Sequence, residues 1–238
     1  MNIVVVGFGK MGQLVKKTAE EHGHQVVMVV DITNCQDLDA LQEKVDCVID
    51  FSHPDNLSWM IPYVKKSGAA LVCGTTGLND LQRKQIEDLK DSNRVIYSAN
   101  YSFGIAVFKE VLSLITPMLE DGFDIEVIEK HHNQKQDAPS GTAKLLVETM
   151  NPDHEYKEVH GRNGMVGKRQ KEIGIHAVRG GTVAGEHTVM FLGDDESFEI
   201  THTATSRQIF VNGAIRAAEF LMTQENGSYT MKDLLFKN

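Results

Sequence analysis

The chain of 238 residues is poor in cysteine and has no long apolar run, and each shortage excludes a class of protein. Its three cysteines are odd in number and lack the close pairing of a zinc or redox motif, so we expect reduced thiols and a cytoplasmic protein. No apolar run approaches the roughly 18 residues of a membrane span, and the first residues lack the features of a signal peptide. We therefore expect no membrane partner.

Positive charge is also scarce. The formal net charge is −9 and the isoelectric point is near 5.6, which disfavours nucleic acid as a partner because binding it requires a positive surface. One basic cluster occurs at residues 157–171, which contain glycines. We interpret it as a solvated loop or a lid that shields the active site rather than as a patch for a polyanion.

Residues 2–100 alternate between apolar strands and amphipathic helices, the pattern of right-handed βαβ units and a parallel sheet. The continuous apolar character of the strands indicates that both faces of the sheet are covered. The pattern predicts strands over 2–6, 26–30, 45–51, 69–73 and 94–97, with helices over 11–22, 57–66 and 80–91.

After Ser102 the pattern changes to helices followed by strands without helices between them. We predict a Rossmann-type doubly wound parallel sheet domain, residues 1–102 and 206–238, for dinucleotide binding. An α+β domain with a mostly antiparallel sheet, residues 103–205, would bind substrate and mediate oligomerisation. The predicted elements are helices over 104–119, 140–150 and 209–222 and strands over 124–132, 172–178, 186–192 and 197–204.

A glycine motif follows the first predicted strand and opens a helix. In that context, a Gly-x-Gly-x-x-Gly loop lets a pyrophosphate approach backbone amides at the positive end of the helix. Asp31 ends the second strand, where a carboxylate would meet the adenosine ribose. The expected cofactor is NADH or NADPH: Asp31 would repel a 2′-phosphate, which favours NADH, whereas Lys10 could attract one. The loop comprises Gly7, Phe8, Gly9, Lys10, Met11 and Gly12.

Two further polar segments follow predicted strands at their carboxyl ends, the rim where doubly wound sheets bind ligands. Turn formation alone would explain their glycine, serine and asparagine content. Because a dinucleotide loop is expected on the same rim, we predict contacts on the nicotinamide side. The residues are Gly74, Thr75 and Thr76, and Ser98, Ala99, Asn100 and Tyr101.

Residues 129–143 concentrate proton carriers and anion ligands. His131 and His132 point to opposite faces of a strand, and adjacent histidines are poorly placed to chelate one ion, so we expect no metal. Surface imidazoles on a solvated strand end are the simpler alternative. However, Lys135 follows, and the turn Ser140-Gly141-Thr142 begins a helix whose free amides and hydroxyls can bind a carboxylate. The spacing excludes a P-loop, and Ser140 lacks the glycine-flanked elbow of a nucleophile.

These motifs closely resemble the 4-hydroxy-tetrahydrodipicolinate reductase family, also called dihydrodipicolinate reductases. The resemblance covers essentially the whole chain, and the run His-His-x-x-Lys-x-Asp-Ala-Pro-Ser-Gly-Thr is its most specific part. The segments that carry it are 129–143, Ile173-Gly174, 179–181, Gly185-Glu186-His187, 199–202 and Asn212-Gly213-Ala214.

The resemblance implies NAD(P)H-dependent reduction of a small cyclic imine dicarboxylate to tetrahydrodipicolinate, in lysine and diaminopimelate biosynthesis. It also implies a homotetramer, an acid/base role for His131 and a proton-donating role for Lys135. Another amino-acid or sugar dehydrogenase and a dinucleotide-sensing regulator remain as alternatives. The substrate ligands implied by the resemblance are His132, Ser140, Gly141 and Thr142.

Overall fold

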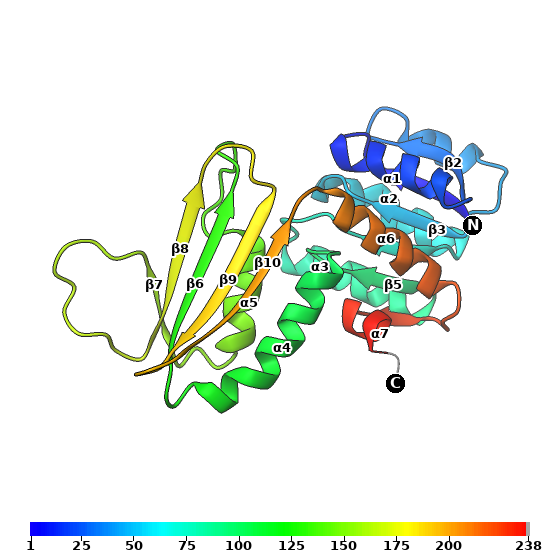
Figure 1. The fold of residues 1–238 in the computed structure, drawn as a ribbon. Coiled ribbons are helices and arrows are strands. Elements are labelled where there is room, and N and C mark those ends of the chain that lie inside the picture. The colour runs from blue at the N-terminus through cyan, green and yellow to red at the C-terminus, as the bar shows by residue number, and fades with distance from the viewer. Residues whose placement is uncertain (237–238) are drawn as a thin grey trace. The chain divides into compact units, whose positions relative to one another are not determined.

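The computed structural model describes residues 1–236. The chain divides into two compact units, Met1–Phe103 with Gln208–Asn238, and Gly104–Arg207 (Figure 1). Within the described residues, no helix is both long and apolar enough to span a bilayer.

The first unit is built on a six-stranded sheet in which every pairing is parallel. The spatial order is β11-β5-β4-β3-β1-β2, with bounds β1 Asn2–Val6, β2 Gln25–Val30, β3 Cys47–Asp50, β4 Ala70–Cys73, β5 Arg94–Tyr97 and β11 Gly227–Tyr229. The central strands β1, β3 and β4 are largely apolar and almost entirely buried, as expected for a sheet covered on both faces.

The helices of this unit match the predicted pattern except near residue 88, where the helix predicted to end at 91 tightens into a 3₁₀ turn. Two short C-terminal elements, β11 and α7, were not predicted, because three to five residues are too few to show a period. The helices are α1 Lys10–Glu21, α2 Leu57–Ser67, α3 Asp80–Glu87, α6 Gln208–Leu221 and α7 Met231–Leu235, with 3₁₀ turns η1 Cys35–Ala40, η2 Pro54–Asn56 and η3 Asp88–Asp91.

The second unit has a five-stranded mixed sheet, so the expected antiparallel character holds for only part of it. β9 runs antiparallel to β6 and β10, whereas β8 runs parallel to β6 and β7. Parallel neighbours need a crossover connection, which the chain provides through α5 between β6 and β8. The order is β10-β9-β6-β8-β7, with bounds β6 Asp124–His131, β7 Lys157–His160, β8 Glu172–Arg179, β9 Gly185–Leu192 and β10 Ser197–Ala204.

Helices α4 (Phe103–Leu119) and α5 (Gly141–Met150) supply the core of this unit together with one face of its sheet. Because side chains alternate along a strand, Ile125, Val127, Glu129 and His131 of β6 share the buried face. The other face carries Glu126, and we call it the open face. Glu129 and His131 are therefore held on the rigid, buried side of the sheet.

Candidate functional site

The glycine loop has the close backbone packing that a dinucleotide loop requires. Gly7 has a φ of +96°, and a Cβ at this position would lie 2.8 Å from the carbonyl oxygen of Phe51. A Cβ at Gly12 would lie 1.8 Å from the carbonyl oxygen of Gly7. Gly9, in contrast, has nothing within 4 Å of a Cβ position, and α1 begins there without a side-chain cap. The first amides of α1 therefore have no side-chain cap, which suits the binding of an anion such as a pyrophosphate.

Asp31 follows the last residue of β2, and its carboxylate is held by Thr33. The backbone amide and hydroxyl of Thr33 donate to Asp31 Oδ1 at 2.8 and 2.5 Å. These hydrogen bonds lower the pKa of Asp31. The carboxylate is thus ionised at neutral pH, in the position where the sequence predicts the ribose, while Lys10 at the start of α1 is exposed.

The two other predicted cofactor segments lie at the carboxyl ends of β4 and β5. The buried side chains of Thr75 and Tyr101 are engaged in holding these turns: Thr75 Oγ1 accepts from the amide of Ser52 at 2.8 Å, and the Tyr101 hydroxyl bonds to the carbonyl of Cys73 at 2.9 Å. Thr76 and Ala99 are exposed, whereas Gly74, Ser98 and Asn100 are half-buried. Side-chain contacts to a cofactor would therefore come from Thr76, Ser98 and Asn100, with Thr75 and Tyr101 shaping the turns.

In the second unit, the structure brings the predicted acid/base histidine together with a buried carboxylate. His131 Nδ1 lies 2.6 Å from Glu129 Oε2, and Glu129 is 0% exposed. Arg179 donates two hydrogen bonds to the same carboxylate, each at 2.7 Å. Burial raises the pKa of Glu129, but the hydrogen bonds from Arg179 and His131 outweigh it and the pKa is lowered. The ionised carboxylate therefore holds the proton on Nδ1 and leaves Nε2 of His131 to exchange protons.

Lys135 lies in the turn after β6, where its ammonium pairs with the Asp137 carboxylate at 2.7 Å. Burial lowers the pKa of His131; the Glu129 hydrogen bond opposes this effect, and the charge of Lys135 adds to it. Lys135 is thus close enough to His131 to act on it electrostatically. His132, just after β6, is half-buried.

The predicted carboxylate-binding turn is present, but Ser140 is engaged within it. Ser140 is 2% exposed; its amide donates to Glu129 Oε1 at 3.0 Å. Its Oγ accepts from the Ala143 amide at 3.1 Å and contacts His187 Nε2 at 3.0 Å. Ser140 therefore connects the start of α5 to the acid/base cluster. Of the other two predicted ligands, Gly141 is exposed and Thr142 is half-buried.

Three members of this cluster were not predicted as site residues. Glu129 precedes His131 by two residues, and strand periodicity places both on one face, but it does not show that Glu129 holds the histidine. Arg179 and His187 come from β8 and β9, and only the register, with His131 opposite Arg179 and Glu129 opposite His187, brings them together. The rings of His131 and His187 lie 5.2 Å apart, edge to face.

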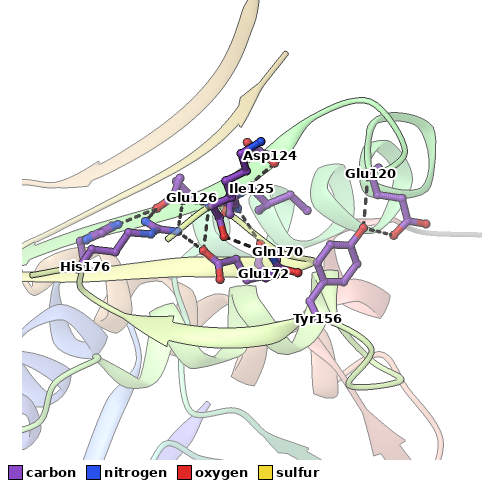
Figure 2. A network of polar contacts seen from close by, with 11 residues as sticks. Glu120, Asp124, Ile125, Glu126, Tyr156, Gln170, Glu172 and His176 are labelled. Atoms are coloured by element: carbon purple, nitrogen blue, oxygen red, sulfur yellow. Dashed lines mark hydrogen bonds and ion pairs between the residues drawn. The ribbon is translucent and has the colours of Figure 1, made fainter. Parts of the chain in front are cut away.

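The basic segment 161–171 is bound to the open face of the sheet, opposite the face that carries His131. Glu126 accepts two hydrogen bonds from Arg162, at 2.9 and 3.0 Å, and also contacts Arg169. His176 Nε2 lies 2.7 Å from the same carboxylate (Figure 2). Both ends of this segment are therefore anchored to the open face.

No group of three or more His, Cys, Asp or Glu side chains within residues 1–236 is arranged to hold a metal ion. The features described are a dinucleotide loop on a parallel sheet and, in a second unit, an acid/base cluster beside a helix start. They define the class of two-domain NAD(P)-dependent oxidoreductases.

Comparison with known proteins specifies the family. Family models described as dihydrodipicolinate reductase, N-terminus and C-terminus, match residues 1–101 and 104–235. The chain is 43% identical to the 4-hydroxy-tetrahydrodipicolinate reductase of Brachyspira hyodysenteriae, covering 99% of this chain and 100% of that one. It is 41% identical to that of Exiguobacterium sibiricum, covering 98% and 96%. The chain belongs to the dihydrodipicolinate reductase family, which confirms the resemblance.

Solved structures agree on the fold. The dipicolinate-bound dihydrodipicolinate reductase of Paenisporosarcina sp. TG-14 matches with a TM-score of 0.79 at 22% identity, over 99% of both chains. GenD2 from gentamicin A biosynthesis, in complex with NAD, matches with a TM-score of 0.63 at 11% identity, over 98% and 90%. The two-unit architecture is thus shared with several dehydrogenases.

Proposed function

We propose that the protein catalyses NAD(P)H-dependent reduction of 4-hydroxy-tetrahydrodipicolinate, or of dihydrodipicolinate, to tetrahydrodipicolinate in lysine and diaminopimelate biosynthesis. The observation that carries the proposal is the buried Glu129–His131 pair beside the Ser140–Thr142 turn, in a chain 43% identical to a reductase of that name.

The chemistry divides between cofactor and chain. The bound cofactor would supply a hydride to the conjugated imine, which the 4-hydroxy substrate forms when its hydroxyl leaves as water. The chain must then deliver a proton to the ring, and a positioned acid typically contributes a factor of about 100 to 10,000 to the rate. His131 serves as the acid/base group through Nε2, because Glu129 holds the Nδ1 proton. Lys135 is the second proton donor.

The dicarboxylate would be bound by positive charge and by backbone amides at the start of α5. Gly141 and Thr142 offer the first amides of α5, where the helix dipole favours an anion. Lys135 and His132 add donors that can pair with a carboxylate. Ser140 supports this turn through His187 and Ala143, in addition to the ligand role that the resemblance implies.

For the cofactor, we propose that residues 7–12, Asp31 and the two rim segments, 74–76 and 98–101, form the binding shell. The ionised Asp31 carboxylate favours a free ribose hydroxyl pair over a 2′-phosphate. NADH is therefore the preferred cofactor. A higher catalytic efficiency with NADPH than with NADH would contradict this preference.

We further propose a cytoplasmic homotetramer assembled through the open face. Successive strand side chains point alternately to the buried face, against which α4 and α5 pack, and to the open face, which we propose is covered by a partner subunit. The free cysteines are compatible with a reducing compartment.

The test is a coupled assay in which the preceding synthase generates the substrate from pyruvate and aspartate semialdehyde, with NADH oxidation as the readout. His131→Ala and Lys135→Ala should each lower turnover by about 100-fold or more, because each removes a proton carrier. NADH binding should be retained. Lys109→Ala, on the exposed surface of α4, is the control and should match the unmodified enzyme. Binding of NADH without turnover would favour a regulator, and near-normal turnover in both variants would contradict the assigned roles.

A further inference from the structure

Asp50 is a fully buried carboxylate at the carboxyl end of β3 that the proposed chemistry does not use. It is 0% exposed and lies opposite Val6 of β1 and Cys73 of β4 in the sheet register. The strands that precede the glycine loop and the 74–76 turn therefore flank it on both sides.

Three side chains next to Asp50 donate hydrogen bonds to its carboxylate, those of Ser52, Cys73 and Thr75. Ser52 Oγ accepts from Asn56 Nδ2 at 3.0 Å, so its own proton is free for Asp50 Oδ1, which lies at 2.5 Å. Thr75 Oγ1 accepts from the Ser52 amide, which likewise leaves its proton for the Asp50 carboxylate. The Cys73 thiol donates to Asp50 Oδ2 at 3.2 Å. Three donated hydrogen bonds match the ionised carboxylate, which is purely an acceptor.

A buried charge of this kind is costly. Burial raises the pKa of Asp50, and the three donors oppose that effect only in part. Within residues 1–236, no lysine or arginine forms an ion pair with it, although paired charges are the usual solution in an interior. A core position that served packing alone would be better filled by an apolar side chain.

The Phe51-Ser52 segment is the geometric link between Asp50 and the cofactor loops. A Cβ at Gly7 would lie 2.8 Å from the Phe51 carbonyl oxygen and 3.0 Å from Ser52 Cβ. A Cβ at Gly74 would lie 2.3 Å from the Phe51 ring. Both loops therefore pack tightly against the Phe51-Ser52 segment. The Asp50 carboxylate holds this segment in place by accepting a hydrogen bond from Ser52 Oγ.

We propose that Asp50 is the positioning residue that fixes the shape of the cofactor rim, by holding Ser52 and Thr75 beneath the glycine loop and the 74–76 turn. The inference rests on the proposed function, because the rim is taken to bind NAD(P)H. Asp50 does not contact the cofactor; it acts through the two loops.

The test compares Asp50→Asn with Asp46→Asn in the full-length protein. The amide keeps the shape of the side chain but replaces one acceptor with a donor aimed at other donors. Asp46, just before the opposite end of β3, accepts from the Asn2 amide at 2.8 Å and is the matched control. Asp50→Asn should weaken NADH binding by about tenfold or more, the size expected when a hydrogen bond to a charged group is lost. Asp46→Asn should leave NADH binding unchanged.

Dipicolinate affinity separates positioning from general damage. The affinity for dipicolinate should be unchanged in Asp50→Asn, because the residues proposed to bind the dicarboxylate belong to the other unit. Partial unfolding would instead weaken the binding of both dipicolinate and NADH. Ser52→Ala, which keeps the carboxylate and removes one donor, serves if Asp50→Asn does not fold, and should weaken NADH binding by at least about threefold. NADH binding equal to wild type in the folded variants, or equal loss of both ligands, would overturn the inference. Failure of the unmodified protein to bind NADH would instead overturn the proposed function.

Discussion

At the residue scale, the Glu129 carboxylate determines which nitrogen of His131 can exchange a proton. We expect Glu129→Gln to lower turnover by up to about 100-fold, because the amide no longer stabilises the protonated imidazole. The hydrogen bond to Glu129 raises the pKa of His131, so its loss should shift the pKa of His131 further down. The corresponding inflection in the pH–rate profile should therefore move to lower pH.

The measurement is kcat/KM as a function of pH, with Glu148→Gln on the exposed surface of α5 as the control. A profile that keeps its inflection while activity falls would mean that Glu129 only supports the fold. Circular dichroism spectra of the variants and the unmodified protein show whether the fold is retained, and only then can a loss of activity be assigned to the chemistry.

His187 links stability to pH. Burial lowers the pKa of its imidazole from 6.5 to about 4. A lowered folded-state pKa contributes stability that is complete above 6.5 and is lost as pH falls toward 4, because the unfolded chain takes up the proton first. The contribution is at most about 3 kcal/mol.

We therefore expect the free energy of unfolding to decline over this interval, and His187→Gln to flatten the decline. Urea unfolding at several pH values measures the free energy of unfolding of both proteins across this interval. An equally steep decline in the variant would mean that other groups cause it. His131 is the first candidate, because its ring lies beside that of His187 and its pKa is also lowered.

At the scale of elements, Gly174 of β8 leaves the space that the Glu126 carboxylate occupies, and this carboxylate holds the segment 161–171. A Cβ at Gly174 would lie 1.9 Å from the Glu126 carboxylate that holds Arg162 and Arg169. Gly174→Ala should displace this carboxylate, free segment 161–171 and cost about 1–3 kcal/mol of stability. Limited proteolysis should then cut the segment faster. Gly180→Ala, where a Cβ meets nothing within 4 Å, is the control; equal cleavage of both variants would show that the anchor lies elsewhere.

The same elements show what sequence reasoning can reach. Most helices and most strands follow from apolar periodicity, and the roles suggested for His131 and Lys135 come from the family resemblance that a dense local motif carries. The parallel pairing of β8 with β6 was not predicted, because strand direction is decided by a crossover rather than by composition. For the same reason Arg179 was missed: its partner Glu129 lies 50 positions away, and only the register unites them.

At the scale of the whole molecule, the proposed assembly makes a prediction about the open face. Met190 of β9 is half-buried there, opposite Glu126 in the register. Met190→Glu should lower the molar mass measured by light scattering, because a charge buried in an interface without a partner is strongly unfavourable. A monomeric unmodified protein, or an unchanged mass in the variant, would contradict assembly through this face.

The first unit is not continuous in the sequence, because the second unit is inserted between its two parts. Helix α6 and strand β11 belong to the first unit, and Gly213 of α6 packs so tightly that a Cβ would lie 1.8 Å from the carbonyl oxygen of Tyr101. The ribosome produces both elements only after the entire second unit. During translation, the second unit is therefore complete before the first. The parallel sheet cannot be completed until its edge strand β11 and its covering helix α6 have been synthesised.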